Sequence, residues 1–444
     1  MPQNPTPESF SLPAIPVGAR AALRAVQTPR FKASRLSLLT VLPQTRETAV
    51  LAPLMLSVLR RGCEGYPSLA AVNRRTDELW GSTILFRDFP FGDRKALGVT
   101  LEFVDSSFLP GKPDLLPDLL DLVRRLLFCP VLDGDGLFPA AVVEDEKRLQ
   151  CDEIESLIAN PRQYAFEHAS SLFFEGRPAG IPAYGSVEET RAVTREALTN
   201  YWKTWRDTAY FSCFYIGAAN PETVATSLAA TLVPLPGTAT APSSFLDVPP
   251  PAFADRVRTK EETLAISQGH LVLGFQTGGI LWGDSRASAV ELAKEVLGGS
   301  PVSLLFMNVR EKLSLCYSVS ASFLNSRGAL FVRCALDPAN REKAEREILL
   351  QIDRLKKGDF TDEELDAARK SLIFYYRTIS DNPGSMERVL FRQELTAAKE
   401  TPAQSIAAFA ALTRKDVTEA AKLFSLQTVY FLRGDAGEGE DDEV

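Results

Sequence analysis

The feature that most constrains the fold of this 444-residue chain is an order of predicted elements that occurs twice. Residues 234–251 read PLPGTATAPSSFLDVPPP, and so dense a run of Pro, Gly and Ser favours a linker over a core element. On each side of it, the pattern predicts a strand, two helices, a strand pair, a helix, a long helix and a closing strand. A repeat of roughly 200 residues is too long for a solenoid unit and indicates two duplicated domains.

The predicted fold class is α+β, with two homologous domains that each have a mostly antiparallel sheet covered by helices. The sequence divides into five expected segments. These are an extended arm at 1–29, an N-terminal domain at 30–233, a linker at 234–262, a C-terminal domain at 263–433 and an acidic tail at 434–444. The tail holds six acids and no base, which is typical of a solvated chain end.

Charge and composition exclude several classes of protein. The net charge is −8, and removing the six acids of the tail leaves −2, with bases dispersed among acids, so no nucleic-acid surface is expected. No apolar run reaches the ~18 residues of a membrane span, and the N-terminus lacks the basic start and apolar segment of a secretory signal. None of the six cysteines forms a C-x-x-C pair, which favours reduced thiols in a cytoplasmic protein and argues against a zinc–thiolate site.

Histidine is too scarce for most catalytic sites. The chain has two, His168 and His270, on opposite sides of the linker, so no H-x-x-E-H or H-E-x-x-H zinc site is possible. A Ser-His-Asp or Cys-His site would have to use one of them, and we interpret both as ordinary residues of a helix and a strand. The G-x-S-x-G elbow, the Walker loop and the G-x-G-x-x-G fingerprint are also absent from the sequence. We therefore predict no catalytic residue and no bound metal in this chain.

One stretch, 297–319, reads LGGSPVSLLFMNVREKLSLCYSV and indicates a corner between a helix and a strand. Gly298 and Gly299 follow an apolar helical run and are expected to supply the left-handed or otherwise unusual backbone of a helix C-cap. A second helix is predicted over 302–312, and β-rich sequence follows from residue 315. The pattern places Arg310 and Tyr317 near the turn.

This stretch and the duplicated halves resemble the C-terminal domain of the insulinase-like M16 metallopeptidases, whose domains have the LuxS/MPP-like fold. The likeness is carried by the Gly-Gly pair before SLLF (303–306), and by VREK (309–312) followed by LCYS (315–318). The N-terminal half is similar too. There, LMLSVLRRGC (54–63) and DELWG (77–81) occupy the place of the family's H-x-x-E-H helix and its downstream Gly.

The resemblance implies that the zinc-binding helix has lost its functional groups. Anchored on Gly62, the family's first histidine, glutamate and second histidine fall on Pro53, Leu56 and Ser57. Serine could not replace a histidine ligand in any ordinary way. We therefore expect the N-terminal site to be catalytically dead.

The helix expected over 143–161 resembles the one that supplies the family's third zinc ligand. Glu153 matches that ligand, and Glu146 matches a second acid two helical turns earlier, on the same side. Two carboxylates without imidazoles would bind zinc poorly, because zinc favours nitrogen and sulfur and takes four ligands. The alternative for both acids is a solvated position on a charged helix.

Within the family, the chain resembles a bacterial subgroup, the YfmF-like proteins, whose name refers to the 5-aminopentanol modification of elongation factor P. This likeness is carried by FEG (174–176) with IPAYG (181–185), and by ISQG (266–269) with GF (274–275). The resemblance as a whole covers about residues 30 to 433.

Active members of the family hold zinc in one half and bind the peptide with the facing half. In a heterodimer, the resemblance implies that one chain carries the zinc while its partner supplies an arginine and a tyrosine, here Arg310 and Tyr317. An arginine can fix a peptide carbonyl or the oxyanion, and a tyrosine hydroxyl can add a second donor. The structural alternative places Arg310 in a surface ion pair and Tyr317 in a core.

The expected protein is a non-catalytic, cytoplasmic M16-like subunit without a cofactor of its own. Its expected partners are a peptide substrate and an M16-like chain that keeps the H-x-x-E-H helix and the zinc. The rival expectation is a binding or scaffold protein with no part in proteolysis, for example an accessory to elongation factor P modification.

Overall fold

The computed structural model describes residues 10, 13–233, 235, 237, 239, 256–396 and 399–435. The chain divides into two compact units. Unit 1 comprises Met1–Glu155, Ile181–Asp247 and Ile379–Thr401, and unit 2 comprises Ser156–Gly180, Val248–Thr378 and Pro402–Val444. Most of the expected linker, most of the acidic tail and the start of the expected arm lie outside the described residues.

Unit 1 is built on a six-stranded sheet in the order β1-β2-β6-β3-β5-β4, in which β2 and β6 are parallel and the other neighbours antiparallel. The strands are β1 (Ile15–Val17), β2 (Ala21–Gln27), β3 (Ala33–Pro43), β4 (Thr83–Phe91), β5 (Arg94–Val104) and β6 (Phe211–Gly217). The first two correct the extended arm expected at 1–29. The segment AALRAVQ of β2 alternates buried and partly exposed residues and pairs with β6, so it belongs to the sheet.

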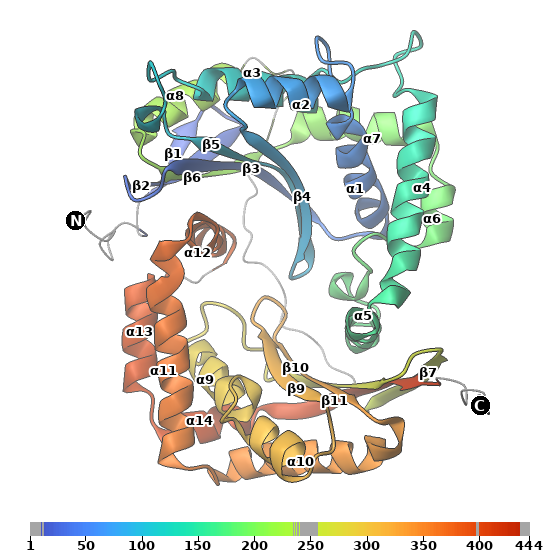
Figure 1. Cartoon of the computed structure of the whole chain (residues 1–444), viewed down its shortest axis with the longest axis vertical. Coiled ribbons are helices and arrows are strands. Elements are labelled where there is room, and N and C mark those ends of the chain that lie inside the picture. Colours follow the sequence, from blue (N-terminus) through green and yellow to red (C-terminus); the bar gives the residue numbers. More distant parts are fainter. Residues whose placement is uncertain are drawn as a thin grey trace, which may run out of the picture. The chain divides into compact units, whose positions relative to one another are not determined.

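One face of this sheet is covered by helices (Figure 1). Apart from α12, the α-helices described in unit 1 are α1 (Arg46–Arg60), α2 (Leu69–Glu78), α3 (Leu116–Phe128), α4 (Ala140–Ser156), α6 (Val187–Arg191), α7 (Arg195–Thr208) and α8 (Pro221–Leu232). Apolar side chains of α1, α3, α7 and α8 form one core with the strands, where each fully buried leucine stabilises the fold by about 2 kcal/mol. The two tryptophans of α7 donate indole N–H groups to Leu127 O (2.9 Å) and Thr40 Oγ1 (3.0 Å), so their burial leaves no donor unpaired.

Unit 2 is built on a five-stranded sheet in the order β7-β11-β8-β10-β9, with β7 and β11 parallel and the other neighbours antiparallel. The strands are β7 (Arg258–Leu264), β8 (Gly269–Thr277), β9 (Ser318–Leu324), β10 (Ala329–Leu336) and β11 (Phe424–Gly434). Strand β7 corrects the end of the linker expected at 234–262. Its sequence RTKEETL is too polar to signal a strand, and it lies at a sheet edge where one side remains free of ladder hydrogen bonds.

The helices on the main core of unit 2 are α9 (Ala287–Gly298), α10 (Arg341–Lys357), α11 (Asp362–Thr378), α13 (Pro402–Ala411) and α14 (Arg414–Ala421). The predicted capping box of α11 is confirmed. Thr361 N donates to Glu364 Oε2 at 2.7 Å, and Glu364 N donates to Thr361 Oγ1 at 3.1 Å. Both units mix helices with mostly antiparallel sheets, so the predicted α+β class is confirmed. In the described ranges, no helix has both the length and the apolar character that a bilayer crossing requires.

One helix of each half of the sequence belongs to the other unit. Helix α5 (Pro161–Phe173) packs on β8 and β11 of unit 2, and α12 (Pro383–Leu395) packs on β6 and β3 of unit 1. The ring of Phe391 on α12 lies 5.1 to 5.7 Å from three phenylalanine rings of the unit 1 strands. This corrects the uninterrupted domains expected at 30–233 and 263–433, because each of these helices buries its apolar side chains on the sheet of the other unit.

Candidate functional site

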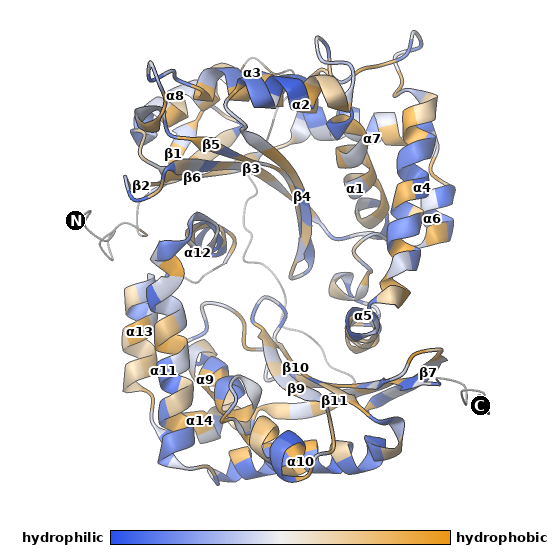
Figure 2. Ribbon diagram, viewed as in Figure 1, coloured by the Kyte–Doolittle hydropathy of each residue, from blue (hydrophilic) through white to orange (hydrophobic). Residues whose placement is uncertain are grey.

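The three positions that the resemblance assigns to the lost H-x-x-E-H groups lie on α1. This helix begins after Thr45, whose side chain accepts a hydrogen bond from Thr48 N at 3.0 Å. Pro53 and Leu56 are buried, and Ser57 is half-buried. Figure 2 shows the middle of α1 in apolar colours, whereas α4 alternates polar and apolar residues. Neither proline nor leucine offers an atom that could bind a metal, so this part of α1 is built for packing.

The acid positions on α4 have two different environments. Glu146 is buried and forms an ion pair with Arg61, the residue that follows α1, whereas Glu153 is exposed. One turn after Glu146, Gln150 is also buried, and its amide donates to Val50 O and to Thr190 Oγ1, both at 3.2 Å. The inner face of α4 therefore holds α1 through one ion pair and one amide bridge.

These residues do not fit a zinc ion. Among the residues that the structure describes, no three His, Cys, Asp or Glu side chains are grouped so that they could hold a metal. The buried carboxylate of Glu146 already has a cation, the guanidinium of Arg61. Zinc needs about four nitrogen, sulfur or oxygen ligands, and the α1 positions provide no imidazole.

The corner predicted at 297–319 is present in unit 2, but its glycines have another role. Helix α9 continues through Gly298, and its C-cap, Gly299, has φ −93°, which is right-handed backbone. This corrects the expected left-handed cap. A Cβ at Gly298 would lie 2.9 Å from Ala321 and from Leu305, and one at Gly299 would lie 2.0 Å from Glu295 Oε2. Gly298 is therefore required by close packing against β9, whereas the close atoms at Gly299 belong to the Glu295 side chain of α9 itself.

The second helix of the corner is a π-helix over Phe306–Lys312, where an α-helix was predicted over 302–312. The side chain of Asn308 is buried within it, donates to Leu304 O at 2.8 Å and accepts from Lys312 Nζ at 3.2 Å. Immediately afterwards, Ser314 has φ +48°, an uncommon value for a residue other than glycine. π-Helical turns cost backbone hydrogen-bond geometry and occur frequently at functional sites.

Both predicted residues of the corner are accessible. The guanidinium of Arg310 lies 4.6 Å from the ring centroid of Phe306 and 3.8 Å from a carboxylate oxygen of Glu311, and its side chain is 42% exposed. Tyr317 is 57% exposed, so it does not lie in a core. The ion pair of Arg310 is long and solvated, so it contributes little to stability.

The corner is fastened to β10 by Tyr317 and its neighbour Cys316. The backbone N–H of Tyr317 donates to Ala335 O at 2.8 Å. The pKa of the Cys316 thiol is lowered, first by a hydrogen bond with the Cys334 thiol and then, against the effect of burial, by the charge of Arg310. These contacts fix the position of the exposed tyrosine relative to the sheet.

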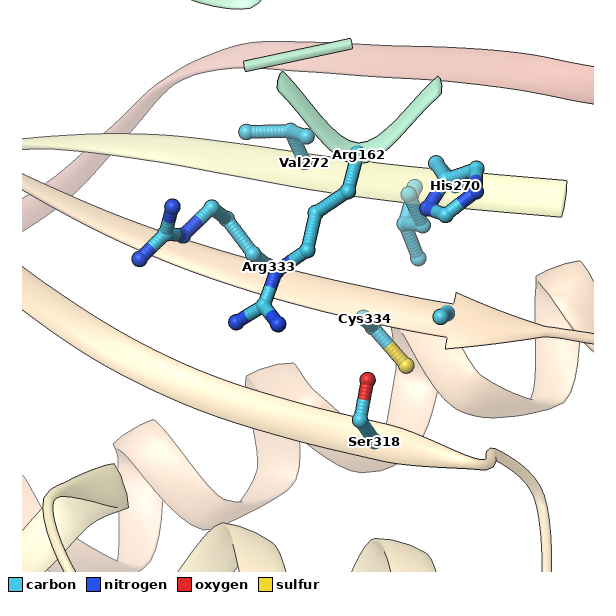
Figure 3. A pocket seen from close by; sticks show the side chains of 8 residues that line it. Arg162, His270, Val272, Ser318, Arg333 and Cys334 are labelled. Atoms are coloured by element: carbon cyan, nitrogen blue, oxygen red, sulfur yellow. The ribbon is translucent and has the colours of Figure 1, made fainter. Parts of the chain in front are cut away.

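A small recess begins one residue beyond Tyr317, on the sheet face that also carries α5. In the strand register Ser318 lies opposite Ala335, and Ala335 lies opposite His270, so a methyl group stands between two larger side chains. Arg333, two residues before Ala335 on β10, borders the recess, and so does Arg162 in the first turn of α5. Figure 3 shows Arg162 extending from α5 toward the strands that carry Arg333 and Ser318. The recess has about 240 Å³ of free space, part of it open to solvent.

The recess is positively charged, and no acid of the described residues pairs with its arginines. Among the described residues, neither Arg162 nor Arg333 forms an ion pair, and Arg333 Nε is buried without a hydrogen-bond partner. Burial lowers the pKa of Arg333 and of His270, and the charge of Arg162 lowers both further. Sequence reasoning did not identify this site. Its one signal was Arg333 inside the apolar strand ALFVRCAL.

The second histidine, His168, lies elsewhere on α5 in a self-contained network. Its ring stacks on Tyr164 at a centroid distance of 4.0 Å, and its Nδ1 lies 3.3 Å from Glu262 Oε2. The same carboxylate accepts hydrogen bonds from Tyr164 and from Tyr430, at 3.2 and 2.8 Å, and pairs with Lys260. The network joins α5 to β7 and β11.

Comparison with known proteins agrees with this architecture. Residues 192–372 match the family described as Peptidase M16 inactive domain. The chain is 24% identical, over 415 residues, to the Probable inactive metalloprotease YmfF of Bacillus subtilis (strain 168), with 93% of this chain and 95% of that protein covered.

Two solved structures share the fold. A conserved protein from Enterococcus faecalis V583 superimposes with a TM-score of 0.87 at 23% identity, covering 96% of this chain and all of the other. The peptidase M16 inactive domain from Pseudomonas fluorescens superimposes with a TM-score of 0.76 at 18% identity, covering 95% and 98% of the two chains. Identities this low show the fold alone.

Proposed function

Because residues 192–372 match the Peptidase M16 inactive domain and the chain is similar to a probable inactive metalloprotease, we propose that it acts as the non-catalytic subunit of an M16-type zinc peptidase heterodimer. Its partner would be an M16-like chain with an intact H-x-x-E-H helix, and the zinc would belong to that partner. The corner at 297–319 would present Arg310 and Tyr317 to a peptide held against the partner's metal.

The observation that carries this proposal is the accessibility of Arg310 and Tyr317 on an unusual backbone. Both side chains are exposed, and the π-helix that contains Arg310 and precedes Tyr317 is anchored by a buried asparagine. A guanidinium and a phenol are suitable donors for a peptide carbonyl or for the oxyanion of a tetrahedral intermediate. The six cysteines are free thiols, which supports a reducing, cytoplasmic location.

The direct test compares the full chain alone with the full chain plus an M16-like partner. We expect the chain alone to bind no stoichiometric zinc and to cleave no peptide, and the pair to form a complex that cleaves. Stoichiometric zinc or cleavage in the chain alone would contradict the proposal. Zinc is measured by atomic emission, assembly by size-exclusion chromatography, and cleavage with a quenched-fluorescent peptide library.

The role of the corner is tested inside the complex. Arg310→Ala should lower the cleavage rate about 100-fold, the usual loss for one transition-state donor, without changing assembly. Tyr317→Phe removes only the hydroxyl and should give a smaller loss. Arg346→Ala, an exposed arginine of α10 whose ion pair with Glu342 spans 3.7 Å, is the matched control. An unchanged rate for Arg310→Ala removes the assigned role.

The rival function is a binding or scaffold protein with no part in proteolysis. It is favoured if the partner cleaves peptides at the same rate with and without this chain. An accessory role in modifying elongation factor P rests on the name of the resembling subgroup. Mass spectrometry of elongation factor P from cells that lack this chain would test that role, because an unchanged modification rules it out.

A further inference from the structure

Arg333 is placed as a ligand-binding arginine would be. It interrupts an apolar strand, its guanidinium lies 5.0 Å from the ring centroid of Phe166, and its Nε is buried without an acceptor. A buried donor without a partner costs about 1 to 3 kcal/mol. Arg162 increases this cost, because the two cations repel. It is close enough for its charge to lower the pKa of Arg333. The two unpaired arginines therefore lower the stability of the free chain. An anion bound in the recess would compensate this loss and explains their placement.

The other unit shows what the missing partner is. On unit 1, α12 occupies the same place in the repeat as α5, directly after the long helix of its half. There Glu387 of α12 is buried and pairs with two sheet arginines, Arg35 and Arg87. On unit 2, the position of α5 that corresponds to Glu387 is Ala165, and the side chain that α5 brings to the recess is Arg162. Within the part of the chain that the structure describes, a carboxylate thus pairs with the arginines of the unit 1 sheet, and none pairs with the arginines of the recess.

We propose that the recess binds a carboxylate group of a peptide, either a C-terminal carboxylate or an acidic side chain, between Arg162 and Arg333. Planar guanidinium groups match the geometry of a carboxylate and bind it with two hydrogen bonds each where space allows. The hydroxyl of Ser318 and the imidazole of His270 add polar groups at the rim. The recess is small and suits one functional group rather than a whole small-molecule ligand.

The recess extends the Arg310–Tyr317 corner into a longer peptide site. Ser318, which lines it, follows Tyr317 directly, and Ala335, at its floor, accepts the hydrogen bond from Tyr317 N. A peptide whose carbonyl meets the corner would then direct its carboxylate toward the recess. The identity of the ligand as a peptide rests on the proposed function, whereas the anion site stands on the geometry of the recess.

The test is direct binding to the full chain without a partner, so it does not depend on cleavage. Three peptides of one uncharged sequence carry the same neutral dye. The first ends in a free carboxylate, the second in an amide, and the third in an amide with one central Glu. We expect fluorescence anisotropy to show the first or the third binding at least about tenfold more tightly than the second, as for a charge-assisted hydrogen bond. Which of the two binds identifies the source of the carboxylate.

Variants of the two arginines make the result specific. Arg162→Gln and Arg333→Gln should abolish the preference for a carboxylate, Arg333→Lys should keep part of it, and Arg346→Gln should leave it intact. Arg162 is exposed on α5, so its variant is expected to fold normally, as checked by circular dichroism. Equal binding of all three peptides, or a preference that survives both Gln variants, overturns the proposal. Inorganic phosphate and acetate are also compared as competitors of the labelled peptide. If phosphate displaces the peptide at a far lower concentration than acetate does, the proposal is overturned in favour of a phosphorylated ligand.

If the recess binds a carboxylate but the complex does not cleave peptides, the carboxylate site is supported and the proposed function fails. If the complex cleaves peptides but the recess shows no preference for a carboxylate, the proposed function is supported and the carboxylate site fails.

Discussion

Helices α12 and α5 occupy equivalent places in the two halves, yet they bring opposite charges to the sheets on which they pack. Glu387 of α12 is buried and joins Arg35 and Arg87, the latter at 2.7 Å. Arg162 of α5 lies beside Arg333, and no acid of the described residues pairs with either. We call the α12 contact closed, because its charges are paired within the chain. We call the α5 contact open, because its two arginines have no acidic partner among the described residues.

The difference separates structural charge from functional charge. A buried ion pair in which all members are present holds its elements in place, and removing one member leaves a costly unpaired charge. A pair of like charges on the face of a sheet stabilises nothing, so its presence points to binding. The Arg61–Glu146 contact between α1 and α4 belongs to the structural kind, although the resemblance places Glu146 beside the lost zinc site.

The largest expected effect is at the closed contact of α12. Glu387→Gln should lower the free energy of unfolding by about 3 kcal/mol, because two partly buried arginines lose their shared counter-charge. Urea denaturation followed by circular dichroism measures it. The control is Arg388→Gln, the next residue of α12, which is exposed and makes one side-chain hydrogen bond, to Ser385; it should change stability by less than about 0.5 kcal/mol. Equal effects of the two variants would break the comparison.

A smaller loss is expected at the contact between α1 and α4. Arg61→Met should cost about 2 kcal/mol, because Glu146 is left buried and unpaired while a third of the Arg61 side chain already faces solvent. The double variant Arg61→Met/Glu146→Leu should recover most of this loss. Arg60→Met, an exposed arginine one residue earlier, is the control. Failure of the second substitution to restore stability would show that packing, not charge, holds the helices.

The open contact should respond in the opposite way. Arg162→Gln is expected to leave the free energy of unfolding unchanged or to raise it by up to about 0.5 kcal/mol, since it removes a repulsive charge. Thermal unfolding in a buffer without carboxylates or phosphate makes the measurement clean. A loss of more than about 1 kcal/mol would mean that Arg162 has a stabilising partner in the chain, and the contrast between the two helices would fail.

The smallest effect concerns pH. Burial, and then the charge of Arg162, hold the pKa of His270 in the folded chain below its ordinary value of about 6.5. The unfolded chain therefore binds more protons once the pH falls below about 6.5, so the free energy of unfolding decreases as the pH drops through the folded pKa. His270→Gln should lose less stability on acidification than the unchanged chain. A bound carboxylate peptide should reduce the dependence as well, because it compensates the positive charge; identical pH profiles would contradict this view of the recess.

The local structure was largely readable from the sequence, because it depends on neighbouring residues. The capping box at Thr361 marked the start of α11, and the alternation around residues 83–104 marked the strand pair β4–β5. Strands β2 and β7 were missed, since one follows a Pro-rich segment and the other is polar along its length. Edge or flanking strands of this kind gain their order from pairing rather than from their own pattern.

The site could be predicted only in part, for reasons of distance along the chain. Arg310 and Tyr317 belong to one short stretch, so their proximity follows from local structure. Arg162 and Arg333 come from opposite sides of the linker, and hydrophobic periodicity states which face of a helix is buried but not against which sheet. The pairing of Glu146 with Arg61 is equally long-range, so its burial could not be deduced from the charged appearance of α4.

Helices α5 and α12, which each pack on the sheet of the other unit, also affect the order in which parts of the chain can fold. Glu387 and Arg35 are separated by 352 positions in the sequence, so one side of the unit 1 sheet stays uncovered until nearly the whole chain has left the ribosome. Contacts of such high sequence separation slow folding, because a very long loop must close before the contact is gained. A chain cut in the linker would leave each sheet without its crossing helix. Its two fragments are therefore expected to aggregate when made separately and to recover solubility when they are synthesised together.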